Sequence, residues 1–233
     1  MILVIGCGHV GNTIADSLSN VVKIDPKLND NKIEDFIYDG AVICLPTPTK
    51  YGICDDSLIE ETINRLGNTN ILIKSTVLPN LLDKYGDNVV YSPEFLREAH
   101  AKEDYEKQNT IVWGGDKNQI DWWISKFHFE HKKNMIMKRK DASVVKYMYN
   151  CFLATKVTVF HELYSKLDTS YDYDNIINTL KEFENIGPSH MKVEQLGYEG
   201  NCFPKDMEAF ANFLESDMLN NVIKVNNKLI GER

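Results

Sequence analysis

The chain begins MILVIGCGHVG (residues 1–11), and this stretch decides the fold. An apolar run ends in a turn that holds three glycines, and a helical pattern continues through Ala15. A second apolar run, VVKI (residues 21–24), then ends in Asp25. Dinucleotide-binding units have this same order of elements: a strand, a glycine-rich turn, a helix, a second strand and an acid. In such units the glycines let a pyrophosphate approach the helix N-terminus. The glycine motif alone is weak evidence, and this order of elements strengthens it.

The glycine turn and Asp25 supply the candidate contacts to a cofactor. The residues that we expect to line the cofactor's pyrophosphate are Gly6, Gly8, His9, Val10 and Gly11. Asp25 is placed to bind the ribose hydroxyls, and its charge disfavours a 2′-phosphate, so the predicted cofactor is NAD and not NADP. For Lys27, a contact on the adenosine side and a solvated loop position are equally open. A tight strand–helix turn without any ligand is the minority alternative.

Further apolar runs extend the predicted sheet. They lie at residues 41–45, 71–77, 89–92 and 110–115, with a helical pattern at 58–66. Strands that alternate with helices predict an α/β fold with a Rossmann-like doubly wound sheet. Pro46 and Thr47 follow the strand at 41–45, at the carboxyl edge where ligands bind in such sheets, although the prolines also fit simple loop punctuation.

Composition narrows the class of protein. The chain has 233 residues and a net charge of −8, which argues against nucleic acid as a partner. No apolar run is long enough to span a bilayer, and the first residues lack the basic segment of a signal peptide. The five cysteines are odd in number and form no CxxC pair, so we expect a reducing, cytoplasmic location, no disulfide framework and no metal site.

The second half of the chain predicts helices. The longest helical pattern covers residues 142–167, with Asp141 as its cap. Its apolar positions are Val144, Val145, Met148, Leu153, Val157 and Phe160. Shorter patterns follow at 172–183, 205–214 and 218–230. We therefore divide the chain into a Rossmann domain (residues 1–138) and a helical central domain (residues 139–233).

The stretch GYEGNCFPKD (residues 197–206) carries a candidate nucleophile. Pro204 suits the first turn of a helix, which would put Cys202 just before a helix N-terminus, where a thiolate is favoured. Lys205 adds a positive charge nearby, and Asp206 adds a carboxylate that can orient a proton or a water. The alternative is a buried structural thiol beside a helix cap.

Three stretches carry a family resemblance. Residues 197–206 resemble the GGxCxPKD signature of the UDP-glucose/GDP-mannose dehydrogenases, while PEFLRE (residues 93–98) and KYMYNCFLATK (residues 146–156) are similar to two further motifs of that family. The resemblance implies NAD-dependent oxidation of the C6 alcohol of a nucleotide sugar to a carboxylate, of the UDP-glucose to UDP-glucuronate type. It also implies a Rossmann-like domain followed by an α-helical domain with one long helix.

The resemblance implies roles for single residues. It implies catalytic roles for Cys202, Lys146, Asn150, Asp206, Thr76, Glu94 and Glu98. At the substrate it places Glu94, Phe95, Leu96, Lys146, Asn150, Tyr198 and Gly200, and at the cofactor, beyond the glycine turn, Pro46, Thr47, Thr76, Glu98 and Lys205. Cys202 would capture the aldehyde as a thiohemiacetal and then carry a thioester, which water activated by Glu94 would hydrolyse. From the residues alone, Lys146 and Asn150 can share a site or a solvated face, and Thr76 can equally cap the next helix.

The chain departs from the family pattern at two positions. Glu199 stands where the family has a second glycine, and Asn185 stands where relatives commonly carry an arginine. The resemblance covers two of three family domains, so we expect the C-terminal UDP-binding domain to be missing. A homodimer through the helical domain is expected because Val222, Val225 and Leu229 would otherwise be exposed.

Two other functions remain open. The departures favour a non-catalytic or partner-dependent NAD-binding protein. A hydroxyacid-type dehydrogenase of the 6-phosphogluconate dehydrogenase superfamily is the other alternative, and it has no need of Cys202.

Overall fold

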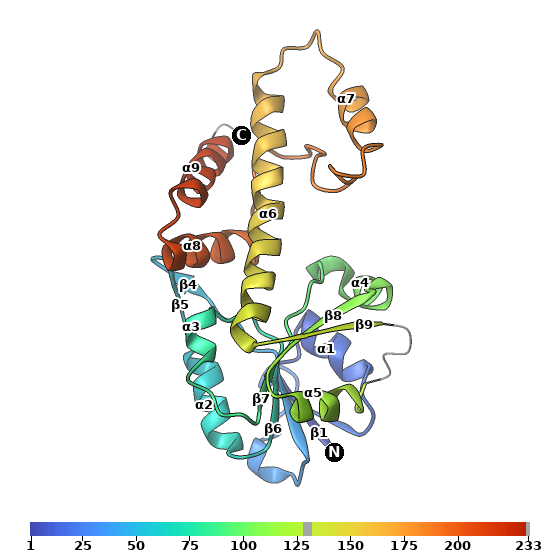
Figure 1. Cartoon of the computed structure of the whole chain (residues 1–233), viewed down its shortest axis with the longest axis vertical. Coiled ribbons are helices and arrows are strands. Elements are labelled where there is room, and N and C mark those ends of the chain that lie inside the picture. Colours follow the sequence, from blue (N-terminus) through green and yellow to red (C-terminus); the bar gives the residue numbers. More distant parts are fainter. Residues whose placement is uncertain (128–131, 232–233) are drawn as a thin grey trace. The chain divides into compact units, whose positions relative to one another are not determined.

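The computed structural model describes residues 1–127 and 132–231. By its contacts the chain divides into two compact units (Figure 1). The first unit consists of Met1–Pro48 and Cys54–Lys146, and the second of Thr49–Ile53 and the chain from Tyr147 onward. The domain boundary expected between residues 138 and 139 remains a prediction.

The described residues of the first unit form a seven-stranded sheet with the order β2-β1-β3-β6-β7-β8-β9. Its strands are β1 (Ile2–Ile5), β2 (Val21–Ile24), β3 (Gly40–Ile43), β6 (Asn70–Ile73), β7 (Val89–Tyr91), β8 (Thr110–Gly114) and β9 (Lys133–Met137). All neighbouring strands are parallel except β7 and β8, which pair antiparallel through Tyr91 and Gly114. The chain order reverses at β1, which lies between β2 and β3, and ligands of open α/β sheets bind beside such a reversal.

Helices cover both faces of this sheet. They are α1 (His9–Asp16), η1 (Ile33–Asp35), α2 (Ser57–Leu66), α3 (Pro79–Leu82), η2 (Glu98–His100), α4 (Ala101–Lys107) and α5 (Lys117–Ile124). Alternate residues of β1 point to opposite faces: Leu3 packs in a core with Ile59 of α2, and Val4 packs in a second core with Ile14 of α1 and Trp123 of α5. Each fully buried Leu or Ile side chain stabilises the fold by about 1.5–3 kcal/mol. The predicted doubly wound α/β sheet is confirmed (Figure 1).

The second unit is mainly helical. Its helices are α6 (Arg139–Lys166), which the division crosses between Lys146 and Tyr147, α7 (Tyr173–Leu180), α8 (Phe203–Leu214) and α9 (Asp217–Gly231). It also holds the hairpin of β4 (Thr49–Lys50) with β5 (Ile53–Cys54), except for Cys54, which belongs to the first unit. The ring of Tyr147 stacks on Phe210 of α8 with centroids 5.1 Å apart. Asn212 of α8 donates from its side-chain amide to the carbonyl of Gly52, 3.0 Å away, which fixes the hairpin on α8.

The buried face of α6 differs from the predicted one. The helix begins at Arg139, so Asp141 lies in its first turn and is not its cap. Met148 is 60% exposed although it was expected on the apolar face, and polar Ser143 is fully buried. Ser143 tolerates burial because its hydroxyl donates to the carbonyl of Val77 at 2.6 Å. The buried face of α6 is therefore made of apolar residues such as Ala142, Tyr147 and Ala154 together with polar residues, such as Ser143, whose hydrogen-bond partners lie elsewhere in the chain.

The apolar residues of α9 are less exposed than expected. Leu229 is buried, and Val222 and Val225 are partly buried. The expectation that Leu229 would be exposed is wrong, because α9 packs against α8 and the cysteine loop of the same unit. The burial of Leu229 within its own unit leaves less apolar surface of α9 for a homodimer interface. Within residues 1–127 and 132–231, no helix combines the length and apolar character that a bilayer crossing requires.

Candidate active site

A hollow of about 480 Å³ lies beside the glycine turn of the first unit. Its lining residues are Cys7, Gly8, His9, Asn12, Thr13, Glu98, Ala99, Ala101 and Lys102. Gly8 is the N-cap of α1 and brings no side-chain acceptor, so the first-turn N–H groups of α1 gain no cap from this residue. The imidazole Nε2 of His9 lies 3.5 Å from the carboxylate of Glu98. Six predicted cofactor contacts thus belong to this hollow or to the turn that forms it, namely Gly6, Gly8, His9, Val10, Gly11 and Glu98.

Two glycines of the turn are required by its geometry. Gly6 has a φ of +84°, a conformation that residues with a side chain rarely adopt. A Cβ on Gly11 would lie 1.9 Å from the carbonyl oxygen of Gly6, so only glycine lets α1 approach the turn this closely. Gly8 differs, because a Cβ there would meet no atom within 4 Å. Its lack of a side chain leaves the hollow open for a ligand.

Asp25 is fixed at the end of β2 by the glycine turn itself. Its carboxylate accepts the backbone N–H of Cys7 at 2.7 Å and that of Lys27 at 2.9 Å. These two hydrogen bonds lower the pKa of Asp25 below its ordinary value of 3.8. Each oxygen keeps a further lone pair that can accept a ribose hydroxyl. The hollow, the open Gly8 position and this ionised acid fit a dinucleotide such as NAD.

Two other predicted cofactor residues are less engaged. The side chain of Lys27 is exposed, while its backbone N–H serves Asp25. Pro46 is exposed as well. Neither residue lines the hollow beside the glycine turn.

The ends of β3 and β6 are held together by hydroxyl groups. Thr47 is buried and donates to the carbonyl of Thr76 at 2.7 Å, and Ser75 donates to the carbonyl of Leu45 at 2.6 Å. Helix α3 begins with Leu78 as its N-cap, without a side-chain capping bond, so the alternative that Thr76 caps this helix is wrong. The hydroxyl of Thr47 therefore holds the backbone of Thr76 at the carboxyl edge of the sheet.

The PEFLRE segment is extended, and its two acids differ in exposure. Residues 92–97 are not helical, and only Glu98 enters η2, so the two carboxylates do not share a helix face. Glu94 is buried, whereas the side chain of Glu98 is 52% exposed at the hollow. The segment leaves β7 directly and is then tied to α4.

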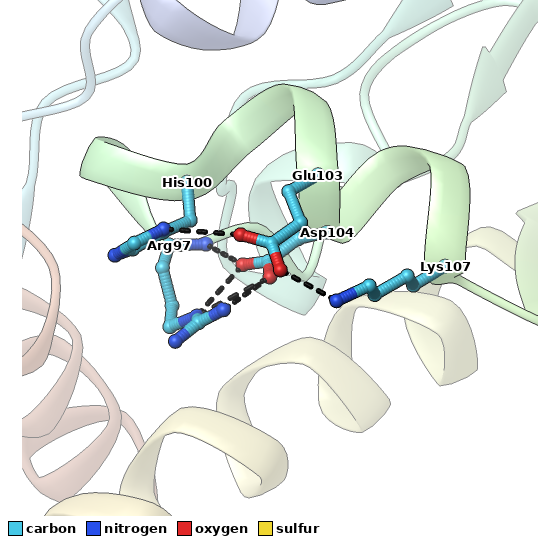
Figure 2. A network of polar contacts seen from close by, with 5 residues as sticks. All are labelled: Arg97, His100, Glu103, Asp104 and Lys107. Carbon is cyan, nitrogen blue, oxygen red and sulfur yellow. Dashed lines mark hydrogen bonds and ion pairs between the residues drawn. The ribbon is translucent and has the colours of Figure 1, made fainter.

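Figure 2 shows the ties between this segment and α4. The backbone N–H of Arg97 donates to Asp104 at 2.8 Å, and its guanidinium donates to both oxygens of the same carboxylate. His100 and Lys107 both contact Glu103. A bidentate pair is the strongest of these contacts, so Arg97 and Asp104 set the path of the chain between Glu94 and Glu98.

Phe95 contacts a residue of the predicted catalytic set. The ammonium of Lys146 lies 5.2 Å from the centre of the Phe95 ring, and Lys146 is only 7% exposed. A cation over an aromatic face is favourable, most of all away from water. The structure thus brings together two predicted substrate residues of the first unit, while Leu96 is partly buried beside the second sheet core.

Sequence reasoning missed the partner of Glu94. Lys74, directly after β6, donates from its Nζ to Glu94 Oε1 at 2.5 Å and to the Ser92 hydroxyl at 3.0 Å. Both members of the pair are buried, at 0% and 5% side-chain exposure. Removing one partner from such a pair costs about 3–5 kcal/mol. The signal in the sequence was a lysine inside the buried run ILIKS, where an unpaired charge is not tolerated.

The second unit assembles the polar residues around the cysteine. Cys202 is exposed and is the N-cap of α8, as predicted. Asp206, one turn later, is 1% exposed and accepts from the Asn150 amide at 2.5 Å and from the Lys205 ammonium at 2.5 Å. Lys205 therefore serves Asp206 in this structure. The result is an exposed thiol at the positive end of a helix, with a fixed carboxylate behind it.

The other cysteines are chemically distinct from Cys202. Burial raises the pKa of Cys151 to about 12 and also raises that of Cys7 and Cys44. These thiols therefore remain protonated at neutral pH. Among the described cysteines, Cys202 alone is exposed.

The cysteine loop is held by a residue that the sequence did not reveal. Asn226 of α9 is buried and makes two hydrogen bonds to the backbone of Tyr198. Tyr198 and Gly200, both predicted substrate contacts, line a second hollow of about 320 Å³. Two acidic residues, Glu199 and Glu208, also line this hollow. The only sequence signal for Asn226 was an amide side chain at a position of α9 that helical spacing places on the buried face.

Comparison with known proteins decides the family. Residues 140–228 match the sequence model of the UDP-glucose/GDP-mannose dehydrogenase family, central domain. UDP-glucose 6-dehydrogenase of Rickettsia bellii is 30% identical over 213 residues, which cover 81% of this chain and 49% of that protein. UDP-glucose 6-dehydrogenase YwqF of Bacillus subtilis is 32% identical over 169 residues, which cover 68% of this chain and 38% of that protein.

The chain belongs to the UDP-glucose/GDP-mannose dehydrogenase family. It spans about half the length of the curated relatives that it matches. The fold agrees with a solved UDP-glucose dehydrogenase from the hyperthermophilic archaeon Pyrobaculum islandicum, with a TM-score of 0.79 at 24% identity, over 99% of this chain and 68% of that one. The resemblance inferred from the three motifs is confirmed.

The family's glycine signature takes a modified form here. Gly197 and Gly200 have φ values of +76° and +89°, so the loop needs glycine at both positions. Glu199 does not have a positive φ, and its side chain is exposed. The loop of this dehydrogenase family member therefore accommodates Glu199 without backbone strain.

Proposed function

We propose that the chain oxidises the C6 alcohol of a nucleotide sugar to a carboxylate in two NAD-dependent steps, with Cys202 as the nucleophile. The observation that carries this proposal is the cluster at α8, where an exposed thiol precedes a buried Asp206 that Asn150 and Lys205 hold. Covalent capture of an aldehyde requires such an accessible thiol beside a positioned polar group. Family membership supports the substrate class, and UDP-glucose is the first substrate to test.

The proposed chemistry assigns a step to each group. When bound, NAD supplies the hydride acceptor for both oxidations. Lys146 and Asn150 stabilise the negative charge on the C6 oxygen as it develops, and Asp206 orients the Asn150 amide for this task. The sulfur of Cys202 then bonds to the aldehyde carbon, which keeps the aldehyde bound as a thiohemiacetal until it becomes a thioester. Water releases the acid, with Glu94 as the proton acceptor.

The first experiment is a calorimetric titration with NAD, followed by UDP-glucose and then GDP-mannose added to the NAD-loaded protein. Absorbance reports NADH, and product analysis reports acid. We expect acid formation with one of these nucleotide sugars, and the reactive one identifies the base. NAD binding without sugar-nucleotide heat and without NADH would instead support a non-catalytic or partner-dependent role.

Two variants test the nucleophile. Cys202→Ser should bind NAD as the parent does but make no acid. The serine hydroxyl would have to form a hemiacetal and an oxygen ester, and these cannot efficiently replace the thiohemiacetal and thioester that the thiol forms. Cys54→Ala is the matched control, because Cys54 is a buried thiol of β5 outside the proposed site. Acid production by Cys202→Ser at the parent rate would contradict the covalent mechanism. The expected homodimer also remains a proposal, which sedimentation of the parent chain tests.

A further inference from the structure

The carboxylate of Glu94 has two oxygens in unlike surroundings. Oε1 accepts the Lys74 ammonium, while Oε2 is buried and makes no hydrogen bond to any residue that the structure describes. Buried polar atoms nearly always have a partner, and one left over calls for a water or a ligand. Oε2 is thus an acceptor that the fold leaves for a group from outside the chain.

Two hydrogen bonds and two aromatic rings hold the Lys74 ammonium. The ammonium donates to Ser92 as well as to Glu94 and lies 5.5 Å from the centre of the Trp113 ring and 5.8 Å from that of Phe127. Aromatic faces stabilise a desolvated cation, so they fix the ammonium where it meets Oε1. Lys74 and Ser92 follow the neighbouring parallel strands β6 and β7, and this pairing brings their side chains to the same edge of the sheet.

We propose that Lys74 is a positioning residue for Glu94: it occupies Oε1, supplies the counter-charge of the carboxylate, and leaves Oε2 to accept a proton from the water that hydrolyses the Cys202 thioester. This inference rests on the proposed function. It explains why a lysine is buried inside an apolar strand run, which an apolar residue of similar volume would fill at lower cost.

The step balances without a further oxidant. The water oxygen bonds to the acyl carbon as the bond between that carbon and the sulfur of Cys202 breaks. The electron pair of the broken bond stays on sulfur. Glu94 Oε2 takes one proton from the water and returns it to sulfur or to solvent, so the products are the acid and the free thiol.

The test compares variants of Lys74. Lys74→Met removes the charge and keeps most of the volume, while Lys74→Arg keeps a cation. Lys107→Met is the matched control, because Lys107 pairs with Glu103 on the surface at 72% exposure. Each folded variant is mixed with NAD and the nucleotide sugar, and three quantities are measured: NADH in the first turnover, acid formed at steady state, and the intact mass of the quenched chain.

We expect Lys74→Met to keep the first-turnover NADH, to lose about 10²-fold in steady-state acid formation, and to accumulate a chain with the mass of the acyl adduct. Glu94→Gln should show the same pattern. Lys74→Arg should restore part of the acid rate, and Lys107→Met should behave as the parent. A residue with only a structural role would lower both phases together and would leave no adduct.

Failure of Lys74→Met to fold does not remove the test. Ser92→Ala deletes one acceptor of the Lys74 ammonium without leaving an unpaired charge, and it should show adduct accumulation to a smaller extent. The inference is overturned if folded variants of Lys74 and Ser92 keep the parent's ratio of first-turnover NADH to steady-state acid formation. A parent chain that forms no NADH with nucleotide sugars overturns the proposed function, and the inference falls with it.

Discussion

The side-chain amide of Asn226 pairs with the backbone of Tyr198 in both directions. Asn226 Oδ1 accepts the N–H of Tyr198 at 2.7 Å, and its Nδ2 donates to the carbonyl of the same residue at 3.1 Å. Asn226 is 3% exposed, so neither bond competes with solvent. One residue of α9 thereby fixes the start of the loop that carries Cys202.

Asn226→Ala should destabilise the protein by about 1–3 kcal/mol, because it leaves the buried N–H and carbonyl of Tyr198 without partners. Denaturant unfolding measures the loss. Asn221→Ala is the control, since Asn221 lies on the exposed side of the same helix. Equal losses for the two variants would show that the pairing with Tyr198 contributes nothing.

Two glycine substitutions should separate folding from cofactor binding. Gly11→Ala places a methyl group against the carbonyl of Gly6 and should lower the melting temperature markedly, because backbone must move. Gly8→Ala meets no atom within 4 Å and should melt as the parent does. Its methyl group nevertheless stands at the hollow beside the turn, so we expect weaker NAD binding by calorimetry. Unchanged NAD affinity in a folded Gly8→Ala variant would place the cofactor elsewhere.

The lowered pKa of Asp25 predicts that the folded chain loses stability in acid. Its pKa in the folded chain is below the ordinary value of 3.8, owing to the N–H groups of Cys7 and Lys27. A lowered folded-state pKa contributes stability that is present above 3.8 and is lost as pH falls through the lower folded value. The stability advantage of the parent over Asp25→Asn should therefore shrink between neutral pH and about pH 2. An advantage that does not change over this range contradicts the assignment.

Alkylation should distinguish the cysteines. A short treatment of the folded protein with iodoacetamide is expected to modify Cys202, because it is exposed while Cys7, Cys54 and Cys151 are buried. Peptide mass analysis locates the label, and Cys202→Ser serves as the control. Labelling of Cys151 at a comparable rate would mean that α6 and α8 separate readily in solution.

Local patterns determined much of the first unit. The strand, glycine turn, helix and acid from Met1 to Asp25 follow from apolar runs, from a φ that only glycine adopts easily and from a close approach at Gly11. These determinants lie within a few residues of one another, so the sequence displays them directly. The same holds for Cys202 at the N-cap of α8, because the following Pro204 marks a first helical turn.

The tertiary structure decided which polar residues are buried and what they contact. Glu94 meets Lys74, 20 residues earlier in the chain, because β6 and β7 lie side by side. Asn150 meets Asp206 across 56 residues for a similar reason, since α6 packs against α8. The sequence by itself thus determined the glycine turn, the position of Cys202 at the start of α8 and the family motifs. Only the fold could pair the charges and amides, because a buried polar group is stable where a distant segment supplies its partner, and no periodicity in the sequence records that partner.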